Sequence, residues 1–418
     1  MAVERTLPTS EAQDLLDLTR GIADKELAPR AAPDEEAGAF PRDVFALLGR
    51  SGLLGLPYPA AYGGGDQPYE VYLQVVEELA ARWLAVGLGV SVHTLSCFPV
   101  AAYGTDAQRA DLLPDMLGGA QLGAYCLSES HAGSDAGALA TRAEPEPGAV
   151  PAPRAGAAEA GPDAEPAGVP EAPGYRITGA KSWITHGGAA DFYTLFARTG
   201  GPGSGREGIS CFHLPAATPG ISADPPERKM GMSASPTAVV RFEDVRAALE
   251  SRIGAEGQGF AIALAALDSG RLGIAACAVG VAQAALDLAL AHSRERHQFG
   301  RPIGDFQGLS FLLADMATQT AAARELYLAA ARRRDAGRPF ATQAAMAKLF
   351  ATDTAMRVTT DAVQVLGGAG YTRDLPAERL MREAKVLQIV EGTNQIQRMV
   401  IGRALAREAR TTEGPAGR

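Results

Sequence analysis

The sequence predicts an α+β fold, with helical segments at both ends of the chain and a compact region of short strands between them. Apolar residues recur at helical spacing before residue 123, and strand-like alternation follows up to about residue 242. Helical periodicity then runs from Gly257 almost without interruption. Because helices and strands are segregated rather than alternating, a Rossmann sheet is not expected. No GxGxxG opens a helix after a strand, and GxxxxGK does not occur.

The N-terminal residues 1–122 are predicted to form an all-α domain. Ser10 and Gln13 have the spacing of a capping box, and Pro29 is expected to end the helix that follows. Further helices are predicted over residues 42–50, 69–83 and 107–117.

The central residues 123–245 are predicted to form a β-domain of sandwich or barrel type. Its candidate strands cover residues 125–128, 175–178, 182–185, 192–197, 209–214 and 237–242. Residues 144–174 are rich in Pro, Ala, Gly and acidic residues, with few apolar anchors, so they are predicted to be a disordered insert.

The C-terminal residues 246–410 are predicted to form a helical domain, followed by a tail over 411–418. Candidate helices cover residues 260–294, 305–335, 342–365, 377–386 and 394–410. Glycine-containing stretches separate several of them.

Composition restricts the class of partner and the compartment. The 418 residues carry a net charge of -9, which argues against nucleic acid as the main partner. The four cysteines are far apart and without CxxC spacing, so we expect buried thiols in the cytoplasm. No secretory signal, no apolar run of membrane-spanning length and no metal-binding histidine spacing are recognised, so neither a membrane nor a metal is expected.

Three separated motifs carry small or aromatic residues next to predicted strands and helix ends. Residues 126–138 place Ser and Gly directly after a strand, where the backbone can approach a flat ring or a phosphate closely. In 181–188, alternation puts Trp183 and Thr185 on one face, where they suit an aromatic cofactor. In 364–383, glycines end one helix and a charged helix follows. Taken singly, these are a turn, a core tryptophan and a helix cap.

The stretch 390–398 places Glu391 in a tight turn beside Gly392, after two apolar residues and before a cap-like Thr393. If this carboxyl is buried, desolvation raises its pKa toward the range of a general base. The alternative interpretation is an acidic residue that accompanies a helix N-terminus.

Together, these four stretches resemble the acyl-CoA dehydrogenase family, in the same order and over nearly the whole chain. The resemblance implies a helical N-terminal domain, a central β-domain and a C-terminal four-helix bundle. It also implies FAD, a homotetramer (or a homodimer), an acyl-CoA substrate and an electron-transfer flavoprotein as electron acceptor.

The resemblance also implies the roles of individual residues. Glu391 matches the catalytic base. The positions that match FAD contacts are Leu127, Ser128, Ser134, Trp183, Thr185, Gln364, Gly368, Thr393 and Gln395, with Arg296, Gln298 and Phe299 reaching FAD from a neighbouring subunit. Positions near the CoA ester are Ser134, Asp268, Arg271 and Gly392.

Some family members carry the base on the long helix instead, near residues 267–271. This chain has Asp268 and Gly270 there but no Glu, which is similar to the short-chain and medium-chain pattern and favours Glu391. The chain departs from the family at the insert, at His186 where Asn is common, and at Val390 where an aromatic residue is frequent.

The implied reaction removes a proton beside the thioester carbonyl and a hydride from the β-carbon, which yields the trans-2-enoyl thioester. It needs a base and donors for the developing oxyanion, while the flavin accepts the hydride. The alternatives are a flavin oxidase or monooxygenase, a dehydrogenase linked to an acyl-carrier protein, and a non-enzymatic FAD or acyl-thioester scaffold. Peroxide release, product hydroxylation or a failure of acyl-CoA to bleach the flavin would distinguish them.

Overall fold

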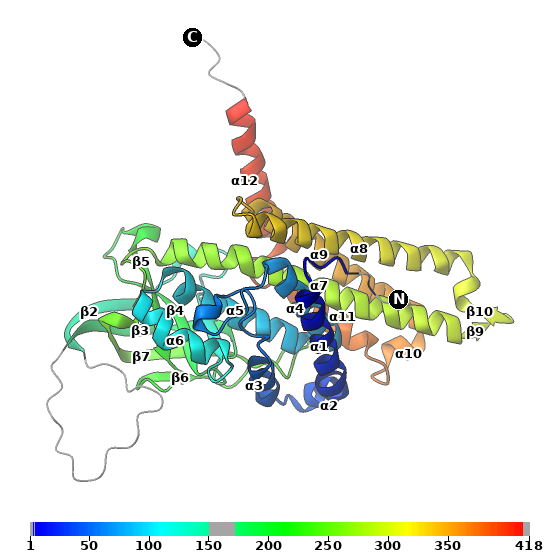
Figure 1. The fold of residues 1–418 in the computed structure, drawn as a ribbon, viewed down its shortest axis with the longest axis horizontal. Coiled ribbons are helices and arrows are strands. Elements are labelled where there is room, and N and C mark those ends of the chain that lie inside the picture. The colour runs from blue at the N-terminus through cyan, green and yellow to red at the C-terminus, as the bar shows by residue number, and fades with distance from the viewer. Residues whose placement is uncertain (1–2, 4, 150–171, 413–418) are drawn as a thin grey trace, which may run out of the picture.

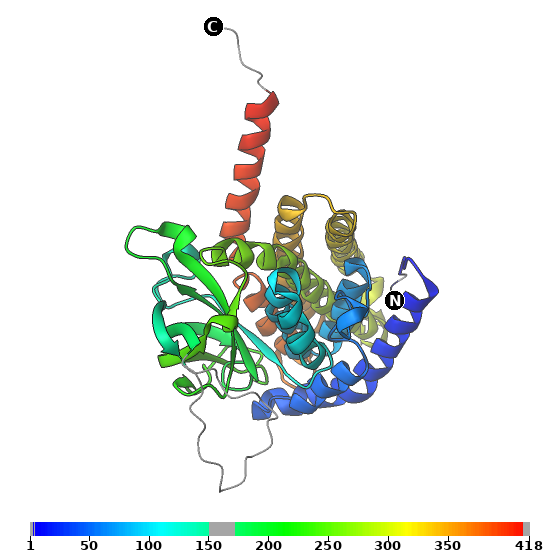
Figure 2. The same ribbon diagram turned by 60° about the vertical axis from the view of Figure 1, so that its left-hand side comes forward.

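The computed structural model describes residues 3, 5–149 and 172–412. A helical N-terminal region, a central sheet and a long helical C-terminal region follow one another, which confirms the predicted α+β arrangement. Figure 1 shows the sheet at one end of the long helix α7 (Gly259–Glu295) and the small β9–β10 hairpin at its other end. The turned view in Figure 2 keeps the sheet and the helices on separate sides.

The N-terminal region begins with a helix that runs further than the sequence suggested. Its N-cap is Thr9, whose hydroxyl accepts the Ala12 N–H at 3.1 Å, so the predicted capping box at Ser10 is wrong. Pro29 does not end the helical run, because it lies in the first turn of the next helix, where no N–H donor is needed. The helices are α1 (Ser10–Ile22), a π-helical turn (Ala23–Leu27), α2 (Ala28–Ala37), α3 (Arg42–Arg50), α4 (Tyr69–Arg82), α5 (Leu84–Tyr103) and α6 (Asp106–Leu117).

Helix α5 was not predicted. It is buried on nearly every side, so its apolar residues form no stripe at helical spacing. Both α5 and α7 are long and apolar enough to span a membrane by length and composition, contrary to our expectation. Their most apolar windows are 89% and 67% buried inside the fold, where both serve as core helices.

The central sheet is mixed and has eight strands. They are β1 (Gly123–Cys126), β2 (Arg142–Ala149), β3 (Ala172–Thr185), β4 (Phe192–Arg198), β5 (Ile209–Pro215), β6 (Ile221–Ala223), β7 (Thr237–Ala248) and β8 (Arg252–Ile253). The order is β6-β7-β3-β2-β4-β5-β8, with β1 parallel to β4. Residues 144–149 and 172–174 were predicted to lie in the disordered insert but belong to β2 and β3, because they pair with each other. Residues 150–171 lie outside the described part.

The C-terminal region packs long helices around α7. It continues with β9 (His297–Gln298), β10 (Arg301–Pro302), α8 (Gln307–Asp335), α9 (Ala341–Leu366), α10 (Gly368–Tyr371), α11 (Ala377–Leu387) and α12 (Asn394–Thr412). Helix α7 contacts α4, α5, α8, α9 and α11, and its centre is buried. Figures 1 and 2 both show α12 projecting away from the other helices.

A buried ion cluster joins the N-terminal region to the C-terminal helices. The Glu77 carboxylate on α4 accepts hydrogen bonds from Arg5 at 2.8 Å, from Arg324 on α8 at 2.9 Å, and from the Tyr327 hydroxyl. Burial alone would raise the pKa of Glu77, but the two guanidinium groups hold it below its usual value. The cluster therefore ties three segments together through one charged carboxylate.

Candidate active site

Glu391 lies in the turn between α11 and α12, in a strained backbone conformation. Its φ is 52° and that of Gly392 is 89°, and such left-handed values cost a residue with a side chain on the order of 1 kcal/mol. The turn is held from two helices: the Gly392 carbonyl accepts Lys348 Nζ of α9 at 3.0 Å and Gln397 Nε2 of α12 at 2.8 Å. These bonds fix the direction in which the Glu391 side chain leaves the backbone.

The Glu391 carboxyl is buried, and neither of its oxygens has a hydrogen-bond partner among the described residues. Burial raises its pKa to about 7, while the positive charges of Lys348 and Arg271 act in the opposite direction. A carboxyl group with a pKa near the working pH is suited to accept a proton.

Gly270 on α7 makes room for this carboxyl. A Cβ atom added at Gly270 would lie 2.1 Å from Glu391 Oε2, so any larger residue there would displace the acid. This contact explains physically why α7 carries no side chain at the position facing Glu391.

Lys348 on α9 is a second charged group beside the turn. It is fully buried and donates to Asn394 Oδ1 at 2.8 Å as well as to Gly392. Burial lowers its pKa to about 7, although the charge of Glu391 opposes this shift. Neither Lys348 nor the contact with Gly270 was found from the sequence, because both depend on the approach of helices distant along the chain.

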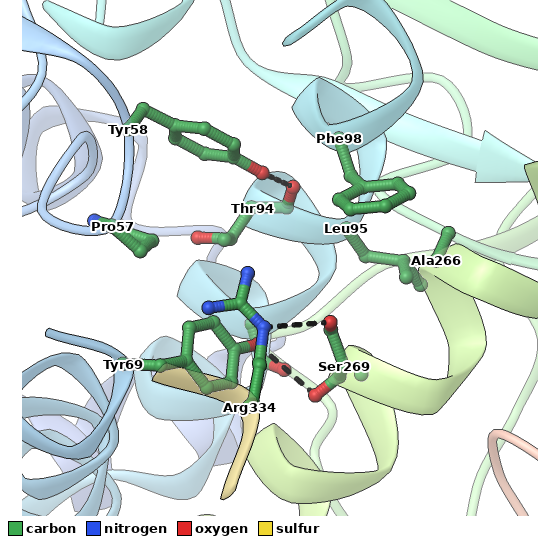
Figure 3. A pocket seen from close by; sticks show the side chains of 11 residues that line it. Pro57, Tyr58, Tyr69, Thr94, Leu95, Phe98, Ala266, Ser269 and Arg334 are labelled. Carbon is green, nitrogen blue, oxygen red and sulfur yellow. Dashed lines mark hydrogen bonds between the residues drawn. The ribbon is translucent and has the colours of Figure 1, made fainter. Parts of the chain in front are cut away.

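A small pocket is lined in part by Gly270, the residue that leaves room for the Glu391 carboxyl. Its walls come from the loop before α4, from α4, α5 and α7, and from the end of α8. Figure 3 shows Tyr58, Tyr69, Leu95 and Phe98 on these walls, with the Arg334 guanidinium among them. The pocket is thus mainly lined by rings and aliphatic groups, with one cation.

A second surface is formed by Trp183 and the loop after β1. Trp183 has φ 58° and is 55% exposed, because β3 has a register break against β7 between Lys181 and Ile184. Simple alternation therefore does not hold through this stretch. The indole lies close to Gly133, where an added Cβ would be 3.9 Å from it, and the neighbouring Ser182 N–H donates to the Ser128 carbonyl at 2.9 Å.

A buried ion pair between Lys181 and Glu129 holds the loop after β1 in place. Lys181 Nζ donates to Glu129 Oε1 at 2.7 Å and to the Leu127 carbonyl at 3.0 Å. Glu129 also accepts the backbone N–H groups of Ala140 and Thr141. An exposed aromatic ring in a strained conformation, beside a glycine and a rigid loop, fits a planar cofactor ring.

The structure brings only part of the predicted cofactor residues together. Leu127 and Ser128 are bonded through their carbonyls to Lys181 and Ser182, next to Trp183. Ser134 is exposed in the same loop, and Thr185 is half-buried at the end of β3. His186, by contrast, is fully buried and hydrogen-bonds to the Gly123 carbonyl at 3.0 Å.

The remaining predicted residues lie elsewhere in the chain. Arg296, Gln298 and Phe299 are exposed on the hairpin at the far end of α7, and Phe299 is 93% exposed. Gln364 and Gly368 are exposed at the α9–α10 junction, Thr393 accepts the Ile396 N–H at 3.3 Å, and Gln395 is exposed. Asp268 pairs with Arg271 at 2.5 Å on α7, on either side of Gly270.

Comparison with known proteins covers almost the whole chain. The models of the acyl-CoA dehydrogenase N-terminal, middle and C-terminal domains match residues 9–120, 154–245 and 257–406. An acyl-CoA dehydrogenase of Bacillus subtilis is 41% identical over 95% of this chain and 98% of its own length.

Two solved structures are similar throughout. Butyryl-CoA dehydrogenase from Megasphaera elsdenii has a TM-score of 0.87 and 39% identity, over 97% of this chain and 100% of the other. A chain from a structure described as the electron transferring flavoprotein of Acidaminococcus fermentans has a TM-score of 0.88 and 40% identity, with the same coverage. From the fold, the buried Glu391 and these matches, it follows that the chain belongs to the acyl-CoA dehydrogenase family.

Proposed function

We propose that this protein dehydrogenates an acyl-CoA thioester to the trans-2-enoyl-CoA, with Glu391 as the base that removes the α-proton. The observation that carries the proposal is the buried Glu391 carboxyl, which has no hydrogen-bond partner among the described residues and lies against Gly270 in the wall of a pocket. A general base must lie where the substrate's proton will be, in the correct protonation state. The raised pKa of the carboxyl and its lack of a hydrogen-bond partner among the described residues both support this role.

The residues around Glu391 position it for proton transfer. Lys348 and Gln397 hold the turn through the Gly392 carbonyl, and Gly270 leaves room for the carboxyl. The positive charges of Lys348 and Arg271 favour the ionised form of Glu391, and they limit the rise in pKa that burial causes.

We propose FAD as the cofactor, held by Leu127, Ser128, Ser134, Trp183 and Thr185. When bound, FAD supplies the acceptor for the hydride that leaves the β-carbon. The exposed indole of Trp183 offers one face to a flat ring, and the loop residues 128–134 offer hydroxyl and backbone groups. The proposed role of Asp268, Arg271, Ser134 and Gly392 is to lie along the CoA ester.

We also propose a homotetramer that passes electrons to an electron-transfer flavoprotein in the cytoplasm. The exposed Phe299 on its hairpin supports an interface with another copy, in which Arg296, Gln298 and Phe299 reach the neighbour's FAD. Gln364, Gly368, Thr393 and Gln395 are proposed to complete the cofactor contacts. The buried free cysteines support a reducing compartment.

The test is a turnover assay of the purified holoenzyme with butyryl-CoA and an electron-transfer flavoprotein. A product lighter by two hydrogens, formed only with the electron acceptor, is the expected result. Rapid peroxide release in air would support an oxidase instead, and a hydroxylated product would support a monooxygenase. If straight, branched and aromatic acyl-CoAs all remain unchanged while flavin is bound, the proposal fails.

The rate should depend on pH through Glu391. Since the base must be ionised, kcat/KM is expected to rise with pH and to level off above about 7, the pKa of the buried carboxyl. Two pH units lower, it should be about 100-fold smaller, because each unit reduces the ionised fraction tenfold. A rate measured from pH 5 to 9 checks this. A flat profile in which the chemical step limits the rate would contradict the assignment.

Trp183 is expected to contribute to flavin affinity. Replacing it by Ala removes the exposed indole and should weaken flavin binding about 3- to 10-fold, the usual range for one aromatic contact. Titration of apoprotein with FAD, followed by flavin fluorescence, measures this change. Trp183→Phe is the matched control, because it keeps an aromatic face and should retain most of the affinity. Unchanged binding in Trp183→Ala would exclude the platform role.

A further inference from the structure

One carboxylate on α9 binds the turn that carries Glu391 at both of its ends. Asp353 Oδ1 accepts Gln388 Nε2 at 2.7 Å, just after α11, and Asn394 Nδ2 at 2.7 Å, at the start of α12. Glu391 lies midway between these two residues in the chain. The backbone N–H of Asn394 also donates to the Gln388 carbonyl at 3.0 Å. The turn is thus closed at its base, and Asp353 joins both of its ends to α9.

The hydrogen bonds around the Asn394 amide leave it only one orientation. Its oxygen accepts Lys348 Nζ at 2.8 Å, and its nitrogen donates to Asp353. An ammonium group can only donate and an ionised carboxylate can only accept, so exchanging the two ends of the amide would lose both bonds. The same holds for Gln388, whose oxygen accepts Lys385 Nζ at 2.8 Å. Asp353 therefore fixes the direction of both amides at the ends of the turn.

The second oxygen of Asp353 has a charged partner. Oδ2 accepts Arg398 Nη2 of α12 at 3.0 Å. The Asp353 side chain is 38% exposed and that of Arg398 is 55% exposed, so solvent screens this ion pair and it contributes little to stability. Asn394, by contrast, is buried. A hydrogen bond to a charged group is stronger there, so the bond between Asp353 and Asn394 is the one that constrains the turn most.

The turn needs this support because its backbone is strained. Glu391 has φ 52°, in the left-handed region, and a residue with a side chain keeps this conformation only where its surroundings enforce it. Bonds from Lys348 and Gln397 to the Gly392 carbonyl hold the middle of the turn. Asp353 supplies the constraint at its two ends.

We propose that Asp353 is a positioning residue for the α-proton transfer, because it closes the turn that directs Glu391. It acts through Gln388 and Asn394 and takes no proton from the substrate itself. Proton transfer requires the base in its productive geometry, and a displacement of about 1 Å costs roughly 100-fold in rate. This inference rests on the proposed function, in which Glu391 is the base.

The test is anaerobic stopped-flow reduction of the FAD-loaded protein by saturating butyryl-CoA, in which the rate constant and the amplitude per protein are read separately. In Asp353→Ala, the rate constant is expected to fall about 10- to 100-fold at full amplitude, because the protein still binds flavin and substrate but holds Glu391 poorly. Asp353→Asn keeps one acceptor oxygen for the two amides and should lose only about 2- to 5-fold. A merely structural role would instead lower the amplitude, since part of the protein would be unfolded or without flavin.

Gln388→Ala removes the bond on the α11 side alone and should slow the reduction less than Asp353→Ala. Combined with Asp353→Ala, it should add no further loss, because Asp353→Ala has already removed that bond.

Gln319→Ala is the matched control. Gln319 on α8 lines the same surface groove between α8, α9 and α12 as Asp353, but it accepts Arg357 Nη1 at 3.2 Å, outside the turn. The rate constant should stay unchanged in this variant.

The outcomes are distinguishable. A wild-type rate constant in Asp353→Ala overturns the inference, as does a loss of amplitude alone or an equal loss in Gln319→Ala. In each of these cases the dehydrogenase proposal stands as long as butyryl-CoA reduces the wild-type flavin. If no acyl-CoA reduces the wild-type flavin, the proposed function fails, and the inference with it. Should Asp353→Ala not fold, Gln388→Ala decides: slower reduction at full amplitude supports the inference, and a wild-type rate constant overturns it.

Discussion

Glu391→Gln is expected to lower turnover at least about 1000-fold while the flavin stays bound. The amide has nearly the same shape as the carboxyl, so the strained turn and its bonds from Lys348 and Gln397 remain. It has no basic oxygen able to take the α-proton. Steady-state rates and the flavin-to-protein ratio, measured on the same preparation, check both parts of this result.

Glu383→Gln is the matched control for this variant. Glu383 on α11 is another buried carboxyl with a raised pKa, about 8, through burial and the nearby charge of Glu35. Its side chain lies against Gly231 and not against the pocket residue Gly270, so its amide variant should keep most of the activity. If Glu391→Gln retains turnover, or if Glu383→Gln loses it to the same extent, Glu391 is not the base.

The raised pKa of Glu391 also predicts that the stability of the fold depends on pH. Its pKa is raised from 4.5 in the unfolded chain to about 7 in the fold, so the folded state binds the proton more tightly. Stability therefore falls as the pH rises from 4.5 to 7, and this loss is complete above 7. Glu391→Gln lacks the loss and should gain stability relative to wild type over that window, as thermal unfolding at pH 5 and pH 8 would show.

Glu77→Leu is expected to lower the free energy of unfolding by about 3–5 kcal/mol. The substitution leaves the guanidinium groups of Arg5 and Arg324 buried without their shared carboxylate, and it removes the partner of the Tyr327 hydroxyl. Breaking one side of a buried ion cluster is costly because the remaining charges stay desolvated. Urea unfolding followed by circular dichroism measures the loss.

Asp224→Asn is the control for this second prediction. Asp224 and Arg241 pair at 2.7 Å on the surface of the sheet, where both side chains are well exposed. Such surface pairs contribute little to stability. A loss in Glu77→Leu no larger than that in Asp224→Asn would show that the buried cluster is not a main stabilising element.

The sequence predicted the C-terminal helices almost to the residue. In α9 and α11 the buried apolar residues follow one face, and glycine-containing stretches such as that around Gly367 separate the helices, so local pattern and tertiary fold agree there. The same reasoning missed α5, because a helix buried on all sides has no polar face to reveal its period. It also misjudged Pro29, since a proline at the start of a helix and one at its end look alike in sequence.

The candidate site was predictable where a motif is local. Glu391 with Gly392, and Trp183 with the loop after β1, are contiguous stretches whose residue types already restrict their chemistry. What was missed depends on contacts between distant segments: Lys348 beneath the turn, Gly270 against the acid, and Arg334 in the pocket wall. No spacing along the chain brings such residues together before the helices pack.

The most direct measurement is a crystal structure of the FAD-loaded protein with a non-oxidisable acyl thioester. The central claim is that Glu391 is the base that removes the α-proton. A Glu391 carboxylate oxygen about 3–3.5 Å from the α-carbon of the bound thioester is the predicted result. A Glu391 side chain turned out to solvent, or another acid beside the α-carbon, would contradict it.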